Sequence, residues 1–335
     1  MKIFISGFGT VGQGVLELLL IKKPYLQTRQ GELFSVVGVV DSKSYYVDSK
    51  EICGLCVLGN KASQGRVSDN PRNGKSCIEI MEMVDFDVLI ETSPTNVEDG
   101  GEGLRNIRWA LEHGKDVITV NKGPLALAFS ELDALAKKNG CIMRYEGSVG
   151  GAMPIINLCR ESLAGQKIKS IQGIFNGTCN FVLSRMDNGL PFEQALKEAQ
   201  QLGYAETDPT YDIEGYDSAS KVVILANSIF GRDVRFSDVS ITGISSVTSE
   251  AVNLAIENGM VIRLIGEVSD TKLEVAPRLI PKGHPLALSG TLNTALITTD
   301  FAGPITVSGR GAGRKETASA ILSDLLAISE TRRKN

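Results

Sequence analysis

The segment MKIFISGFGTVGQGVLELLLI, residues 1–21, contains the pattern that decides the fold. A short β-rich run is followed at once by Gly7-Phe8-Gly9-Thr10-Val11-Gly12 and then by an apolar helical stretch. GxGxxG alone is a weak signal, but between a strand and a helix it has a physical meaning. The first glycine permits a tight turn, the second lets the backbone approach a pyrophosphate, and the third allows close packing of helix on strand. These six residues therefore predict a dinucleotide site at the N-terminus of a helix.

Four further apolar runs continue this pattern, at residues 34–40, 87–92, 116–120 and 141–146. Short strands that alternate with helices are typical of a parallel sheet covered by helices on both faces. We therefore predict an α/β fold with a doubly wound parallel sheet, and we expect a dinucleotide-binding domain over residues 1–146.

The rhythm changes after Gly150, and the second half is predicted to be α+β. Helical spacing of apolar residues appears at 191–202 and near 215–230. The expected strands are 168–175, 241–248, 261–268, 272–280 and 291–299. The last helix is expected from about Thr317 to Ser329, after a glycine turn and before a frayed tail. We expect domains over 147–306 and 307–335, the last returning the chain to the first domain.

The composition narrows the class of protein. The chain of 335 residues has a net charge of −4, with 42% hydrophobic and 22% charged residues. This balance gives no electrostatic case for nucleic acid or an anionic membrane as a partner. No apolar run approaches the ~18 residues of a membrane span, and the N-terminus does not resemble a signal peptide. We therefore expect a cytoplasmic protein whose partner is a small molecule.

The six cysteines are expected to be reduced thiols, as is usual for a cytosolic chain of this size. Cys53 and Cys56 have CxxC spacing, but no second CxxC or paired histidines could complete a zinc site. Their role is left open.

The second predicted strand ends at Asp41, where an acid would accept hydrogen bonds from the adenosine ribose hydroxyls. An acid there favours NAD. Ser42, Lys43 and Lys61 could instead receive the 2′-phosphate of NADP, so the sequence leaves the choice between the two cofactors open.

Polar residues follow the next two strands, at the sheet edge where open α/β proteins bind ligands. Thr92 and Ser93 come after the third strand, and Lys122 comes after the fourth, between strand and helix. We expect the first two at the cofactor. A lysine in such a loop is by default a surface residue, but the position of Lys122 between strand and helix suits a nicotinamide site.

An acidic stretch in the second half stands out. Residues 203–227, GYAETDPTYDIEGYDSASKVVILAN, place five carboxylates within fifteen positions and end them on Lys221. Lys221 comes four residues after Asp217, hence on the same helix face, and directly before an apolar run. A lysine on a largely buried helix is costly unless it has a partner. The stretch is either a solvated loop with a surface ion pair or half of an active site.

The chain resembles homoserine dehydrogenase from residue 1 to about residue 329. The resemblance rests on the opening segment and on an ordered series of motifs: ETSPTN (91–96), TVNK (119–122), EGSVGGAMPII (146–156) and GIFNGTCNFVLSRM (173–186). It implies NAD(P)-dependent interconversion of L-homoserine and L-aspartate 4-semialdehyde, in threonine, methionine and isoleucine biosynthesis. It also implies a Rossmann domain joined to a dimerisation and substrate domain, and a homodimer. The family's larger members carry a C-terminal regulatory ACT domain; the sequence ends at the catalytic core, so threonine feedback through such a domain is not expected.

The resemblance also implies roles for individual residues. It places substrate-binding acids at Glu206, Asp212 and Asp217, the catalytic lysine at Lys221 and a second active-site lysine at Lys122. Asp208 and Glu214 are loop and cap residues in this interpretation. The glycine motif around Gly311 matches one that returns the chain to the cofactor.

Glycine-rich backbone beside an acid can present carbonyl oxygens to a hard cation. Family members bind a sodium-like ion in this way, which here implies Glu146 with the carbonyls of Val149, Gly151 and Met153. A simple turn between domains is the alternative.

Two other functions compete with this interpretation. A semialdehyde dehydrogenase would acylate a cysteine, and Cys179 is the candidate, but neither His113 nor His284 sits in a motif that supplies the usual base. A dinucleotide sensor without catalysis is the second rival. The combination of Lys122, Glu206 and Lys221 argues against it, because a sensor needs no group for proton transfer.

Overall fold

The computed structural model describes residues 1–334 and divides into two compact units. Unit 1 contains Met1–Ser148 and the C-terminal segment from Gly313, and unit 2 contains Val149–Ala312. The expected boundary at residue 306 falls inside a strand that continues to Arg310.

Unit 1 is built on a six-stranded sheet of order β3-β2-β1-β4-β5-β6. All neighbours are parallel except β3, which runs antiparallel to β2. The strands are β1 (Lys2–Ser6), β2 (Ser35–Val40), β3 (Tyr45–Val47), β4 (Val88–Glu91), β5 (Asp116–Thr119) and β6 (Met143–Arg144). The strand order reverses beside β1, since β2 follows on one side and β4 on the other. Open α/β sheets bind their ligands at such a point.

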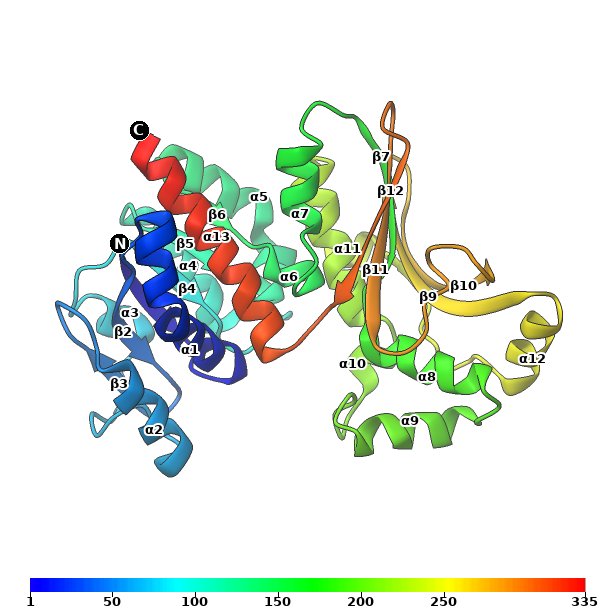
Figure 1. Cartoon of the computed structure of the whole chain (residues 1–335), viewed down its shortest axis with the longest axis horizontal. Coiled ribbons are helices and arrows are strands. Elements are labelled where there is room, and N and C mark those ends of the chain that lie inside the picture. Colours follow the sequence, from blue (N-terminus) through cyan, green and yellow to red (C-terminus); the bar gives the residue numbers. More distant parts are fainter. Residues whose placement is uncertain (335) are drawn as a thin grey trace. The chain divides into compact units, whose positions relative to one another are not determined.

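Helices cover both faces of this sheet (Figure 1). They are α1 (Thr10–Tyr25), α2 (Gly54–Gln64), α3 (Cys77–Met81), α4 (Gly101–Glu112), α5 (Lys122–Lys138) and α13 (Arg314–Lys334). Ile3 and Ile5 of β1 pack with α1, α2 and α13 in one hydrophobic core. Phe4 points to the other face, where its ring contacts Phe86, which in turn contacts Trp109 of α4. The alternation along β1 therefore buries both of its faces, as the apolar run predicts.

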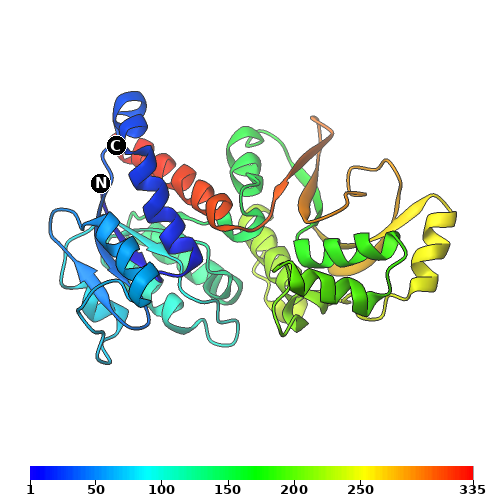
Figure 2. The ribbon, with the colours of Figure 1, turned by 60° about the horizontal axis from the view of Figure 1, so that its bottom comes forward.

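The C-terminal helix α13 lies beside α1 (Figure 2). The expectation of a frayed tail after Ser329 is wrong, because the helix continues to Lys334. Arg332 is paired with buried Asp116 and Arg333 with buried Glu32. These two ion pairs hold the last helical turn against the rest of unit 1.

Unit 2 contains a second six-stranded sheet, of order β12-β11-β7-β9-β10-β8. Its strands are β7 (Ile168–Ile174), β8 (Ser240–Ile241), β9 (Met260–Ser269), β10 (Leu273–Pro281), β11 (Leu292–Thr299) and β12 (Pro304–Arg310). Its longer helices are α8 (Gly177–Asp187), α9 (Phe192–Gln201), α11 (Tyr216–Ile229) and α12 (Ser249–Glu257), and shorter ones are α7 (Ile155–Asn157) and α10 (Thr210–Ile213). A four-residue helix, α6 (Gly147–Gly150), spans the sequence boundary of the two units.

One strand prediction in unit 2 is wrong, and one strand was not predicted. The expected strand 241–248 is reduced to the two residues of β8, because Ile244 N–H donates to the Ile213 carbonyl and so turns the backbone away from the sheet. The strand that was not predicted is β12, which pairs antiparallel with β11 over its whole length and precedes the expected glycine turn at residues 311–313.

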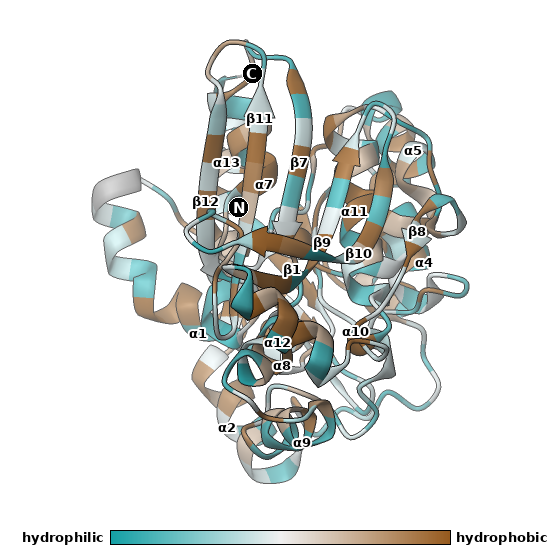
Figure 3. Cartoon of the chain, turned by 90° about the vertical axis from the view of Figure 1, so that its right-hand side faces the viewer, coloured by the Kyte–Doolittle hydropathy of each residue, from teal (hydrophilic) through white to brown (hydrophobic). Residues whose placement is uncertain are grey.

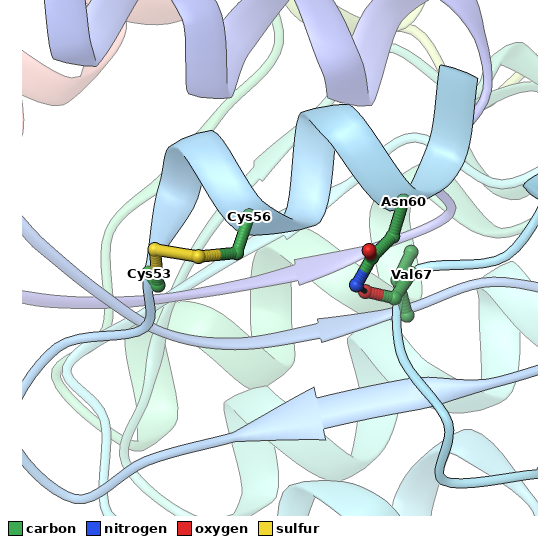
Figure 4. The surroundings of a disulfide bond; sticks show 4 residues. All are labelled: Cys53, Cys56, Asn60 and Val67. Carbon is green, nitrogen blue, oxygen red and sulfur yellow. Dashed lines mark hydrogen bonds between the residues drawn. A yellow bond between two sulfur atoms is a disulfide. The ribbon is translucent and has the colours of Figure 1, made fainter. Parts of the chain in front are cut away.

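The expectation of six reduced cysteines is wrong for one pair. Cys53 and Cys56 form a disulfide, with their Cα atoms 5.2 Å apart, at the start of α2 (Figure 4). The other four cysteines are free thiols. No helix within residues 1–334 is long and apolar enough to cross a membrane.

Candidate functional site

The glycine turn after β1 has the geometry that the sequence predicts. Gly7 has a φ of +84°, and a Cβ there would lie 2.5 Å from the Ser93 nitrogen, so only glycine fits. A Cβ on Gly12 would lie 2.3 Å from the Gly7 carbonyl oxygen. Both glycines are therefore required by the fold of the turn itself.

Gly9 differs from these two glycines. A Cβ built on it meets no atom within 4 Å, so packing within the protein does not demand glycine there. Gly9 is exposed and is the N-cap of α1, and it makes no side-chain cap hydrogen bond. An open glycine at an uncapped helix N-terminus suits a phosphate that approaches the backbone closely. The turn therefore fits the pyrophosphate of a dinucleotide.

The neighbouring residues of the motif contribute in different ways. The Phe8 side chain is 1% exposed and belongs to the hydrophobic core, so only its backbone faces the turn. Val11 packs against the same core, whereas Thr10 is exposed. Thr92 Oγ1 donates to the carbonyl oxygens of Ser6 at 3.1 Å and Gly7 at 2.6 Å, so this side chain holds the turn in place.

A buried polar network lies beneath the turn, and the sequence did not reveal it. Glu91, at the end of β4, is 0% exposed and accepts hydrogen bonds from Ser93 N–H at 2.7 Å and Asn106 Nδ2 at 3.0 Å. Asn106 Nδ2 also donates to Ser6 Oγ at 3.1 Å. Burial raises the pKa of Glu91, although the hydrogen bonds from Ser93 and Asn106 oppose the shift. The network fixes the two strand ends that carry the turn and the Thr92–Ser93 loop.

Asn121 supports the same loop from the N-terminus of α5. Its Nδ2 lies 3.3 Å from Ser93 Oγ, and its Oδ1 accepts the Gly123 N–H as an N-cap. Lys122 is the first residue of α5 and is half-buried. Thr92, Ser93 and Lys122 therefore lie where the sequence predicts them, at the carboxyl ends of adjacent strands β4 and β5.

Asp41 lies just after β2 and is 6% exposed. Its Oδ1 accepts the backbone N–H groups of Lys43 at 2.8 Å and Ser44 at 2.7 Å. Its Oδ2 accepts Lys61 Nζ at 2.6 Å. Burial alone would raise the pKa of Asp41, but these hydrogen bonds outweigh it and hold the pKa below its usual value. An ionised carboxylate with a lysine partner therefore lies at the predicted ribose position.

Part of the acidic stretch of unit 2 gathers around Lys221, which is buried. Lys221 and Asp217, on α11, are each 7% exposed. Lys221 Nζ donates to Asp217 Oδ2 and to the Phe175 carbonyl oxygen, both at 2.6 Å. An ammonium has three N–H donors, so one N–H is left for a further acceptor. The interpretation as a surface ion pair is wrong, because both partners are buried.

Asn176 links this pair to a second acid, and the sequence did not single it out. Its Nδ2 donates to Asp217 Oδ2 at 2.9 Å and to Asp212 Oδ1 at 2.7 Å, while its Oδ1 caps α8 through Cys179 N–H. Burial and the negative charge of Asp217 raise the pKa of Asp212. An asparagine directly before a helix indicates an N-cap, and that was the available signal.

Glu206 is exposed in the loop between α9 and α10, and its backbone carbonyl accepts Gln200 Nε2 at 3.1 Å. Asp208 accepts the N–H and the hydroxyl of Thr210, and Glu214 is the C-cap of α10, so both are loop and cap residues as expected. The structure thus brings Asp212, Asp217 and Lys221 together and leaves Glu206 at the surface of the unit.

Two glycine-rich segments of unit 2 meet backbone to backbone. Gly151 has a φ of +56°, and a Cβ there would lie 2.6 Å from the Gly311 carbonyl carbon. Ala152 N–H donates to the Arg310 carbonyl at 3.2 Å. A Cβ on Gly311 would collide with Asn293. The predicted residues Val149, Gly151 and Met153 are buried in unit 2, and Glu146 is buried in unit 1. Over residues 1–334, no three His, Cys, Asp or Glu side chains gather to hold a metal ion.

Cys179, the nucleophile of the rival dehydrogenase, is 0% exposed. Its thiol contacts the Asp212 carbonyl oxygen at 3.1 Å. Burial, reinforced by the charges of Asp212 and Asp217, raises the pKa of this thiol well above its usual value. A thiol that resists ionisation is a poor nucleophile, so the site does not favour acylation of this cysteine.

Comparisons with known proteins agree with this arrangement. Residues 7–146 match the family model described as homoserine dehydrogenase, NAD binding domain, and residues 154–326 match the model described as homoserine dehydrogenase. Homoserine dehydrogenase of Methanocaldococcus jannaschii is 48% identical, with 100% of each chain covered. NAD(+)-dependent homoserine dehydrogenase of Pseudomonas canavaninivorans is 38% identical, covering 98% of this chain and 96% of the relative.

Solved structures give the same result. An Archaeoglobus fulgidus protein assigned to homoserine dehydrogenase superposes with a TM-score of 0.90 at 50% identity, covering 98% of this chain and 99% of the other. A hyperthermophilic archaeal homoserine dehydrogenase in complex with NADPH superposes with a TM-score of 0.84 at 30% identity, covering 98% of each chain. The matches span both units, and the chain therefore belongs to the homoserine dehydrogenase family of NAD(P)-dependent oxidoreductases.

Proposed function

We propose that Lys221 is the group that transfers a proton to and from the substrate oxygen. The observation that carries this proposal is the buried ammonium with two short hydrogen bonds and one N–H to spare. When the aldehyde is reduced, its oxygen needs a proton, and the free N–H of Lys221 Nζ supplies it. When homoserine is oxidised, the neutral amine takes the hydroxyl proton. A positioned acid–base group of this kind typically contributes about 10²–10⁴-fold to the rate.

Asp217 and the Phe175 carbonyl orient Lys221. Because both accept from the same Nζ, they fix its position and direct the third N–H away from themselves. Asn176 donates to the same Asp217 oxygen that Lys221 uses, which restricts the rotation of that carboxylate. These contacts support a role for Asp217 in positioning the lysine as well as in holding the substrate.

The substrate ammonium provides a reason for the remaining acids. L-Homoserine carries a positive ammonium group, and a carboxylate bonds such a group more strongly than a neutral acceptor does. We assign this contact to Glu206 and Asp212, with Asp217 nearby. Asp212 lies 2.7 Å from Asn176, which holds its carboxylate inside the same cluster.

In unit 1, the glycine turn and the Thr92–Ser93 loop bind the dinucleotide backbone, and Gly311 of unit 2 is the predicted further contact. The bound NAD(P) accepts or supplies the hydride. Lys122, at the N-terminus of α5, works at the nicotinamide end of this site. It follows β5, the neighbour of β4, and Thr92 and Ser93 follow β4. Unit 1 is accordingly the cofactor domain, and unit 2 is the substrate and dimerisation domain.

Asp41 favours NAD, and Lys61 makes NADP acceptable. The Asp41 carboxylate repels a 2′-phosphate, whereas the Lys61 ammonium, 2.6 Å from it, offsets part of that charge. The relatives named above include one that is NAD(+)-dependent and one that binds NADPH. We propose that the protein uses both cofactors.

A monovalent cation is the second group that we propose, bound by the 146–153 segment. Its ligands are the Glu146 carboxylate and the carbonyl oxygens of Val149, Gly151 and Met153. The support is chemical, since these are the oxygen ligands that a hard cation prefers.

We also propose a homodimer formed through the open face of the unit 2 sheet. Helices α8 and α11 pack against one side of this sheet, whereas no helix lies in front of β7, β11 and β12 in Figure 3. Leu292 of β11, on this open face, is 38% exposed. As an enzyme of amino-acid biosynthesis, the protein is expected in the cytoplasm.

One assay tests the central proposal. Homoserine oxidation is followed through the absorbance of the reduced cofactor, with NAD and with NADP, for the wild type and Lys221→Ala. We expect the variant to lose most of kcat with either cofactor while it still binds NADH in a fluorescence titration. Near wild-type turnover of the variant would remove Lys221 from the mechanism. Activity that requires phosphate would favour the rival acylating dehydrogenase.

A further inference from the structure

The Cys53–Cys56 disulfide closes the first turn of α2, a helix that buries few of its residues (Figure 4). Cys53 is the N-cap and makes no side-chain cap hydrogen bond. Two of the eleven residues, Gly54 and Gly59, are poor helix formers, each costing roughly 1 kcal/mol relative to alanine. Gly54 and Val57 are the only buried residues of the helix. The covalent bridge therefore replaces a cap and part of the missing packing.

The other end of α2 reaches the predicted adenosine ribose site. Asn60 Nδ2 donates to the Val67 carbonyl oxygen at 3.3 Å, the hydrogen bond drawn in Figure 4. One residue further, Lys61 Nζ donates to Asp41 Oδ2 at 2.6 Å and to the Gly65 carbonyl oxygen at 3.2 Å. Lys61 follows Cys56 by five residues, or about 8 Å along the helix axis. The disulfide and the ribose-side ion pair thus belong to one short helix.

The exposure of its two residues sets this pair apart from the buried cysteines. Cys53 and Cys56 are both exposed, whereas Cys77, Cys159 and Cys179 are buried. Thiol–disulfide exchange requires access of the attacking thiolate to a sulfur atom. A disulfide at a surface helix N-terminus meets this requirement, and a thiolate formed there is stabilised by the helix.

We propose that Cys53–Cys56 is a thiol–disulfide exchange site, reduced by a dithiol, whose redox state tunes the affinity of unit 1 for the 2′-phosphorylated cofactor. Its second part rests on the proposed role of Asp41 and Lys61 in cofactor binding. Exposed disulfides in cytosolic proteins are usually transient or redox-sensing, which fits an exchange site better than a structural bond.

The exchange balances in two steps. A thiolate of the dithiol attacks one sulfur of the bridge, a mixed disulfide forms, and the other cysteine leaves as a thiolate that takes up a proton. The second thiol of the reductant then attacks the reductant sulfur that is bonded to the protein in the mixed disulfide. This closes the reductant into a ring and releases the remaining cysteine. Two electrons and two protons move from the dithiol to Cys53 and Cys56, and the reductant becomes a cyclic disulfide.

Reduction removes the covalent closure of the first turn, and a helix that buries only two residues is then held less rigidly. Lys61 is held less firmly at Asp41, so the carboxylate charge that faces the ribose 2′ position is less offset. NADPH should bind more weakly, whereas NADH, which has no 2′-phosphate, should change little. Because a partly exposed ion pair is worth up to about 1 kcal/mol, the loss for NADPH is expected to be about threefold to fivefold.

The test titrates the full-length protein with NADPH and with NADH by fluorescence, after treatment with oxidised or reduced dithiothreitol and removal of the reagent. The number of reactive thiols is counted on the native protein with a chromogenic disulfide. We expect two additional thiols after reduction, with the weaker NADPH binding given above. Cys53→Ser/Cys56→Ser should behave like the reduced protein under both treatments, and Cys141→Ser should respond like the wild type.

Lys61→Ala separates the two parts of the argument. If it weakens NADPH binding while reduction of the wild type exposes two thiols and changes neither affinity, the link between bridge and cofactor is overturned. If Lys61→Ala changes no affinity, the proposed role of Lys61 fails instead. If no thiols appear on reduction of the native protein, the exchange site itself is overturned.

Discussion

Asp217 Oδ2 lies 2.6 Å from Lys221 Nζ, one turn earlier on the same buried helix. The same oxygen accepts Asn176 Nδ2 at 2.9 Å. A lysine and an asparagine from different elements thus share one carboxylate oxygen. This arrangement fixes the direction of the lysine ammonium, which is what a proton donor requires.

We expect Asp217→Asn to lower kcat for homoserine oxidation by roughly tenfold or more, because the ion pair with the Lys221 ammonium becomes a hydrogen bond to an uncharged amide oxygen. The amide keeps the volume of the side chain, so the Tm should change little. The kcat is measured with saturating cofactor, and Asp208→Asn, in the nearby loop, is the matched control. Equal kcat values for Asp217→Asn and the control would contradict the positioning role.

Glu206→Gln should raise KM for homoserine more than KM for the cofactor. If Glu206 holds the substrate ammonium, the substitution replaces an ion pair with a weaker hydrogen bond to an uncharged amide oxygen. Folding should be unaffected, because the side chain is exposed in a loop. Steady-state kinetics and a thermal melt check both points. A joint decrease in both affinities and in Tm would show that Glu206 is structural.

Asp41→Asn should shift the cofactor preference toward NADP. The amide oxygen can still accept the N–H groups of Lys43 and Ser44, while the charge that repels a 2′-phosphate is removed. We expect the ratio of kcat/KM for NADP to that for NAD to rise about fivefold, equivalent to roughly 1 kcal/mol. A wild-type protein that already prefers NADP by a factor of ten would argue against the proposed role of Asp41.

Glu91→Gln should be tolerated, whereas Glu91→Leu should lower the free energy of unfolding by about 2 kcal/mol or more, because it leaves the buried Ser93 N–H and Asn106 Nδ2 without this acceptor. The glutamine side chain resembles the protonated carboxyl. Its amide N–H can donate to Asn106 Oδ1, which has no hydrogen-bond partner, once the Asn106 amide group is flipped.

The pH dependence of Glu91→Gln follows from the raised pKa of Glu91. Because the pKa of Glu91 is raised in the folded protein, the folded wild type is most stable when Glu91 is protonated. It loses stability as the pH rises above the usual value of 4.5 for this acid. The Tm of Glu91→Gln relative to the wild type should therefore increase between pH 5 and pH 8. A difference in Tm that stays constant over this range would contradict the shift.

The cofactor unit was predictable from sequence because each of its signals is local. The glycine turn, each apolar strand and the acid after the second strand are each recognised from residues that are adjacent in the sequence. The buried network of Glu91 and Asn106 was not predictable, because it depends on the pairing of β1 with β4.

The features of unit 2 that were not predicted likewise depend on contacts between segments far apart in the sequence. Residues 241–248 are rich in β-branched residues, but Thr242 N–H and Ile244 N–H bond to Val275 and Ile213, which the local sequence does not reveal. The clustering of Asp212 and Asp217 around Asn176 likewise depends on how α8, α10 and α11 pack. The Cys53–Cys56 bridge was missed because spacing alone does not give an oxidation state.

The most direct measurement of the central claim is chemical rescue of Lys221→Ala by a small primary amine. The variant leaves a space beside Asp217 and the Phe175 carbonyl that ethylamine can enter. If Lys221 transfers the proton, kcat of the variant should rise in proportion to added ethylamine, and more basic and less basic amines of similar size should differ in rate. The cofactor affinity should not change. A variant that binds cofactor and homoserine normally but gains no activity from any amine would contradict the account.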